Sequence, residues 1–83
     1  MPMFDVTVTL ELARGHTAGT AGLNPAVLGD HKYTIEARTE RSAVERALLD
    51  FRHAVRIGDR DAVEVSAMAI QHRRPGFKRK DIN

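Results

Sequence analysis

The chain of 83 residues contains no cysteine, no tryptophan and one tyrosine, and it has no long apolar run. Without thiols it can have no disulfide framework, no thiolate zinc site and no cysteine nucleophile. No apolar stretch approaches the roughly 20 residues that a membrane helix needs, and the first residues lack the basic and apolar regions of a signal peptide. We therefore expect one small cytoplasmic domain with no membrane partner, because the chain is too short for two domains.

The formal net charge of +2 is unevenly distributed along the chain. Residues 1–70 carry eight Lys or Arg and ten Asp or Glu, which gives a net charge of −2. Residues 71–83 carry five Lys or Arg and one Asp, which gives a net charge of +4. Such an uneven distribution of charge is evidence about binding partners and not about the fold. The sequence predicts a single domain over 1–72 and a basic, flexible C-terminal tail over 73–83.

Alternating apolar and polar residues predict two strands in the first half of the domain. The alternation is strict over Phe4–Leu12 and returns over Lys32–Arg38. The 13–30 segment between them is rich in glycine and breaks both periods, so we expect a long irregular loop. Asn24 and Pro25 suit the cap and first position of one short helical turn within this loop.

A helix and a third strand are predicted in the second half of the domain. Apolar residues recur at three- and four-residue steps over Ala43–Val55, with Thr39 as the expected N-cap and Gly58 as the expected stop. The third strand is expected over about 62–72. A right-handed crossover then predicts an α+β fold of the β-β-α-β type. Its three-stranded antiparallel or mixed sheet has the order 2-1-3, with one main helix on one face.

The third strand has an imperfect alternation, which leaves two interpretations open. Val63 and Val65 fall on one face, whereas Met68 and Ile70 fall on the other. A β-bulge near Ser66-Ala67 would bring both pairs to the core. Otherwise Met68 and Ile70 point away from the core and meet a second subunit. Because the sheet has two exposed edges and a small core, we expect a homodimer.

The basic tail is the first candidate binding site. Its cations could neutralise phosphates and release condensed counterions, and its one aromatic ring could stack on an unpaired base. A solvated terminus that only aids solubility would have the same composition. The candidate nucleic-acid-binding residues of the tail are Arg73, Arg74, Phe77, Lys78, Arg79 and Lys80.

The folded domain offers weaker candidates. Three arginines fall near one side of the expected helix, although Glu45 lies among them and reduces the positive charge. The expected outer sheet face has mixed charge and no aromatic ring, which disfavours RNA recognition by base stacking. The interaction candidates within the domain are Arg41, Arg52, Arg56, Met68 and Ile70.

Catalytic and metal-binding patterns are weak. The four histidines fall on different predicted elements, and His53, three residues after Asp50, has no third ligand at a local spacing. The glycine-rich loop lacks the Gly-Lys-Ser/Thr ending of a phosphate-binding loop, and neither Ser42 nor Ser66 lies in a nucleophile elbow. We therefore expect no enzyme, no metal and no cofactor.

Two functions remain as hypotheses. The first is a small non-catalytic binding module that docks an anionic partner, nucleic acid or a nucleoprotein, through the basic tail. The alternative is a protein-binding adaptor or inhibitor encoded by a phage or other mobile element, of which anti-CRISPR proteins are an example. Such a protein would cover a partner's surface with an exposed strand edge or with the long loop.

Overall fold

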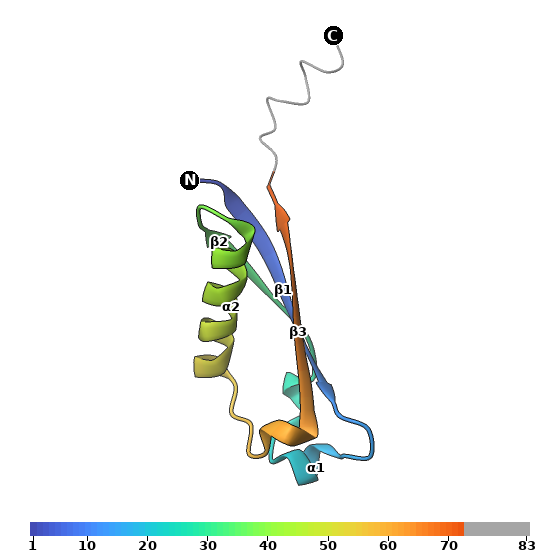
Figure 1. Cartoon of the computed structure of the whole chain (residues 1–83). Helices are drawn as coiled ribbons and strands as arrows, with labels where there is room; N and C mark the ends of the chain where they lie inside the picture. Colours follow the sequence, from blue (N-terminus) through green and yellow to red (C-terminus); the bar gives the residue numbers. More distant parts are fainter. Residues whose placement is uncertain (73–83) are drawn as a thin grey trace.

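The computed structural model describes residues 1–72, which form a three-stranded sheet with one long helix against one face (Figure 1). The N-terminus and the end of the last strand lie at the same end of the sheet. None of the described helices is long and apolar enough to cross a membrane. In chain order the elements are β1 (Met3–Leu12), α1 (Ala18–Ala21), η1 (Pro25–Val27), β2 (Gly29–Glu36), α2 (Glu40–Ala54), η2 (Arg60–Ala62) and β3 (Val63–Gln71).

The sheet has the order β2-β1-β3, which confirms the α+β fold expected from the sequence. Strand β1 pairs antiparallel with both neighbours, so every pairing in the sheet is antiparallel. The most apolar strand thus occupies the centre, and β2 and β3 form the two edges. Both edge strands are antiparallel to β1, so they run in the same direction. Helix α2 connects the end of β2 to the start of β3.

The core lies between the sheet and α2. Alternate residues of β1 from Phe4 to Leu10 are buried, as strict alternation in the sequence predicts. The helix contributes Phe51 and two alanines, and the small alanine side chains allow α2 to approach the sheet closely. The buried core cluster consists of Phe4, Val6, Val8, Leu10, Ile35, Ala37, Ala43, Ala47, Phe51 and Val55.

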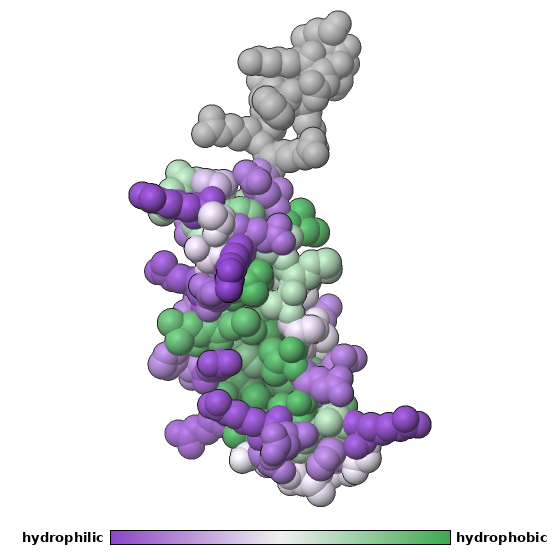
Figure 2. All heavy atoms as spheres, in the orientation of Figure 1, coloured by the Kyte–Doolittle hydropathy of each residue, from purple (hydrophilic) through white to green (hydrophobic). Residues whose placement is uncertain are grey.

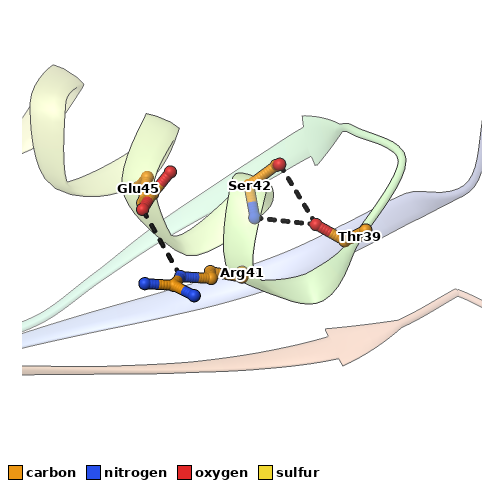
Figure 3. Close-up of polar contacts among 4 residues, drawn as sticks. All are labelled: Thr39, Arg41, Ser42 and Glu45. Atoms are coloured by element: carbon orange, nitrogen blue, oxygen red, sulfur yellow. Dashed lines mark hydrogen bonds and ion pairs between the residues drawn. The ribbon is translucent and has the colours of Figure 1, made fainter.

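Helix α2 begins at the expected N-cap (Figure 3). The hydroxyl oxygen of Thr39 accepts a hydrogen bond from the backbone N–H of Ser42 at 3.1 Å. This bond satisfies one of the N–H groups that the first helical turn leaves without a partner. Arg41 and Glu45 lie one helical turn apart, and Arg41 Nε is 3.7 Å from Glu45 Oε2. The helix ends at Ala54 with Val55 as its C-cap, four residues before the expected stop at Gly58.

The 13–30 segment contains more structure than its sequence predicts. Asn24 caps η1 and Pro25 begins it, which confirms the expected helical turn. A second short helix, α1, precedes that turn and is capped by Thr17. The segment is also tied to the α2–β3 connection, because the Gly58 N–H donates to the Gly22 carbonyl at 3.1 Å.

Strand β3 is regular, and the bulge interpretation is wrong. Nine consecutive residues of β3 pair with β1, from Val63 opposite Leu12 to Gln71 opposite Phe4. The register places Val63, Val65, Ala67 and Ala69 on the helix side of the sheet. Met68 and Ile70 lie opposite Thr7 and Asp5 on the other face, which we call the outer face. Met68 and Ile70 therefore point away from the core, which is the direction that the second interpretation gives them.

Candidate interaction surface along strand β3

The outer face exposes large apolar side chains along β3. Met68 is 64% exposed and Ile70 is 63% exposed, although both belong to a regular strand. Met3, which starts β1, is also exposed and lies beside the end of β3, because the His72 N–H donates to the Met3 carbonyl at 2.7 Å. Exposed apolar residues that gather in one place are characteristic of interaction surfaces, whereas scattered ones are not.

The helix side of β3 carries a second apolar surface, which is a groove between α2 and β3. Figure 2 shows apolar residues gathered over this region and bordered by hydrophilic ones. The groove has a volume of about 230 Å³. Val65, at the β3 side of this groove, remains 43% exposed. The groove is lined by Leu48, Phe51, Arg52, Val55, Ile57, Arg60, Val63 and Val65.

The backbone of β3 has a free side at the edge of the sheet. The N–H of His72 donates to Met3 of β1, and the carbonyl of Ala62 accepts from the N–H of Ala13, the residue that follows β1, at 2.8 Å. In an antiparallel ladder, successive residues alternate between the two sides of the strand. The even-numbered residues of β3 therefore bond to β1. The N–H and C=O groups that point away from the sheet belong to residues 65, 67, 69 and 71, and at position 63 to the C=O alone, because the Val63 N–H donates to the Arg60 carbonyl.

Charge is distributed unequally along β3. Near its start, η2 with its N-cap Asp59 carries Asp61 and Arg60, and Glu64 of the strand lies directly opposite Glu11 of β1. Like charges directly opposite each other destabilise a sheet. At its end, His72 Nε2 lies 2.7 Å from Asp5 Oδ1, and the basic tail follows in the sequence. The strand thus begins in acidic surroundings and leads into a basic segment.

The rest of the outer face is polar and mainly acidic. The register places five carboxylates on this face, together with Lys32 and several threonines. Thr9 donates to Asp30 at 2.8 Å across β1 and β2, which is an ordinary surface contact. None of the described residues on this face is Phe, Tyr or Trp, so it lacks the large aromatic rings on which bases usually stack. The five carboxylates belong to Asp5, Glu11, Asp30, Glu36 and Glu64.

The three helix-side arginines do not form one basic surface. Arg41 pairs with Glu45. Arg52 lines the groove beside β3. Arg56 lines a different and shallower hollow of about 440 Å³, beside α1 and η1. Of the three arginines, Arg52 alone lines the groove beside β3, on the opposite face of the sheet from Met68 and Ile70.

The histidine and tyrosine on the helix side of β2 serve the packing of the domain. His31 Nε2 lies 2.6 Å from the Val27 carbonyl, and its ring meets that of Phe51 edge-on at 5.0 Å. Burial and, to a smaller extent, the carboxylate of Asp50 raise the pKa of Tyr33 above its ordinary value of 10.0. Within residues 1–72, no three His, Asp or Glu side chains gather in a way that could hold a metal ion.

Sequence reasoning missed Val65, Arg60 and the contact between His72 and Asp5. Strict alternation through β3, taken without a bulge, would have placed His72 and Asp5 on one face of the sheet. The groove depends on how α2 lies over β3, and the local sequence carries no signal for it. The tail candidates Arg73, Arg74, Phe77, Lys78, Arg79 and Lys80 lie outside the described residues.

Comparisons of the chain with protein-family models, with curated proteins and with solved structures found no match.

Proposed function

We propose that this protein is a small non-catalytic binding module that docks a protein partner through the β3 surface. By the β3 surface we mean the free edge of β3, the outer-face residues Met68 and Ile70, and the groove between α2 and β3. The observation that supports the proposal is the coincidence of these three features on one strand. An edge strand with apolar side chains exposed on both sides resembles the sites to which partner proteins add a strand.

The chemistry of the outer face favours protein over nucleic acid as the partner of the folded domain. Phosphates would meet five carboxylates on this face, and like charges oppose association. Apolar side chains such as Met68 are instead suited to burial against another protein, and methionine adapts its shape to the surface it meets. An adaptor or inhibitor from a phage or other mobile element could act in this way, by covering its partner.

A second function is favoured by the charge of the tail. Residues 71–83 carry a net charge of +4 on a domain that is itself slightly acidic. A segment of this composition would bind nucleic acid or a nucleoprotein through its phosphates, with an affinity that falls steeply as salt rises. The cytoplasmic location expected from the sequence belongs to this proposal too, since nucleic acids and their partners are abundant there.

A nuclease-controlled pull-down separates the two functions. The full chain, the Met68→Ser/Ile70→Ser variant and a chain lacking residues 73–83 serve as baits in host lysate, with and without nuclease. We expect a protein that survives nuclease treatment and is lost with the double variant, because both side chains are exposed and available for contact. Leu49→Ser is the matched control, since Leu49 is 54% exposed on α2 and does not line the groove.

Two outcomes would contradict the proposed protein docking. One is a partner that the double variant retains and the Leu49→Ser variant loses, which would move the docking site to α2. The other is capture that requires both nucleic acid and the tail, which would support the second function instead.

A further inference from the structure

Strand β3 is the less protected of the two edges. Seven consecutive residues, 65–71, carry no charged side chain, and the strand contains neither proline nor lysine. The other edge, β2, carries Asp30, Lys32 and Glu36 within eight residues. Charged side chains, bulges and prolines are the usual means by which proteins prevent an edge from pairing. Between Glu64 and His72, strand β3 contains no charged side chain, no bulge and no proline.

The charges at the two ends of β3 define which strand would complement it. Its start carries three carboxylates, Asp59, Asp61 and Glu64, against the single cation of Arg60, whereas His72 at its end is followed in the sequence by Arg73 and Arg74. A second β3 laid antiparallel brings the acidic start of each strand against the basic end of the other. A parallel arrangement brings like charges together, which would oppose pairing. Strand β3 is therefore complementary to itself in the antiparallel direction.

We propose that β3 pairs antiparallel with β3 of a second copy of this chain, so that two three-stranded sheets join into one of six strands. This inference rests on the proposed function, in which β3 is the docking surface, and a partner captured from a lysate would compete with the second copy for it. A two-fold axis relates the two copies, so each contributes the same surface, as in most homodimers. The free N–H and C=O groups of the odd-numbered residues then pair across the axis.

The register follows from charge and from the alternation of the backbone. Pairing that uses the free groups joins odd-numbered residues to odd-numbered residues, so the axis passes through Ala67 or Met68. An axis at Ala67 places the Glu64 carboxylate against the apolar Ile70. An axis at Met68 places Glu64 against His72 of the second copy and Ile70 against Ser66. We infer the axis at Met68, because it leaves no carboxylate against Ile70 and sets each Glu64 against the end of the other strand that leads, in the sequence, into Arg73 and Arg74.

This register accounts for the exposed apolar residues. The two Met68 side chains meet at a position that does not form hydrogen bonds, where facing side chains are closest. On the helix side, Ala67 and Ala69 pair across the axis, and Val65 faces Gln71 of the second copy. The added strand also extends the apolar surface beside the groove at Val65, which is 43% exposed in a single copy.

Sedimentation equilibrium of the full chain tests the proposal, with two variants of β3. Ala67→Pro removes a free N–H that points away from β1, so it blocks the edge while leaving the ladder to β1 intact. Glu64→Lys puts a cation, in both symmetric contacts, against the end of the other strand that leads in the sequence into Arg73 and Arg74. Within one copy it instead relieves the repulsion from Glu11. Glu36→Lys makes the same change of charge on β2 and is the matched control.

We expect the wild type to dimerise and its dissociation constant to rise with salt. Glu64→Lys should raise the dissociation constant by about tenfold or more, since the charge that faces the end of the other strand is reversed at both symmetric positions. Its resistance to urea in dilute solution should not fall, which distinguishes a lost interface from a lost fold. Ala67→Pro should be a folded monomer, and Glu36→Lys should dimerise as the wild type does.

Self-pairing is overturned if the wild type is monomeric at every concentration, or if neither β3 variant weakens the dimer. These results differ from a failure of the proposed function. A monomeric chain whose capture of a foreign protein still depends on Met68 and Ile70 would refute self-pairing alone. If neither self-association nor capture depends on β3, both proposals fail.

Discussion

Gly22 and Gly58, which lie far apart in the sequence, meet where the 13–30 segment packs on the α2–β3 connection. Gly22 has a φ of 69°, in the left-handed region, and a Cβ atom there would lie 2.9 Å from the Gly58 Cα atom. The Asp59 N–H donates to the carbonyl of Ala21 at 2.9 Å beside this contact. Neither a side chain nor the more common backbone conformation fits at position 22.

Replacement of Gly22 by alanine should therefore destabilise the protein. The left-handed conformation costs a residue with a side chain about 1–2 kcal/mol, and the close approach to Gly58 adds to this cost. Gly19→Ala is the matched control, because Gly19 lies in helix α1 and its nearest contact to a built Cβ atom is 3.7 Å. Alanine at such a site stabilises a protein by about 0.4–1 kcal/mol. Urea unfolding that shows equal stabilities for the two variants would contradict this assignment.

The elements on the helix side of the sheet create an unusual environment for the one tyrosine. Tyr33 lies on the helix side of β2 and is half-buried against the core cluster. Burial disfavours the charged tyrosinate, and the carboxylate of Asp50 on α2 disfavours it further. Both causes raise the pKa of Tyr33 in the folded protein.

Alkaline titration of tyrosinate absorbance should detect this shift without interference, because the chain has no tryptophan and no second tyrosine. The folded protein should show a pKa above the ordinary 10.0, and the urea-unfolded protein should not. Asp50→Asn should lower the folded pKa only part of the way, since burial is the larger cause. Asp30→Asn, a matched change on the outer face of β2, should leave it unchanged.

The sign of the effect on stability follows from the direction of the shift. A group whose pKa is higher in the folded state stabilises folding below its unfolded pKa. That contribution is lost as the pH rises through the folded pKa. The protein should accordingly lose stability above pH 10, and Tyr33→Phe should lose less of it over the same range. Identical pH dependence in the two proteins would contradict the assigned cause.

The elements also show how far the sequence could predict the fold. The strict alternation of β1 and the helical period of α2 identified both elements, because each buries large side chains on one face. In β3 the residues on the buried side from position 67 onward are Ala67 and Ala69, whereas the large Met68 and Ile70 face outward. Side-chain size therefore pointed to the wrong face, and only the register with β1 resolved the ambiguity.

At the scale of the whole molecule, the β3 surface combines features that no single element contains. The groove requires α2 to lie over the sheet, and the free edge requires β3 to occupy its end. The sequence nevertheless contained one global signal, which is the separation of an acidic domain from a basic tail. The self-pairing that we propose would give part of this separation a structural role, because it would set the start of one β3 against the end of another.

The most direct test of the β3 pairing is amide hydrogen exchange of the full chain, measured residue by residue at low and high protein concentration. The free N–H groups of residues 65, 67, 69 and 71 point away from β1, and they become bonded only when a second strand is added. The account predicts that exchange at residues 65, 67, 69 and 71 slows at high concentration. Exchange along β2, the other edge, should not change. Exchange in β3 that is independent of concentration, or protection that appears along β2 instead, would contradict the account.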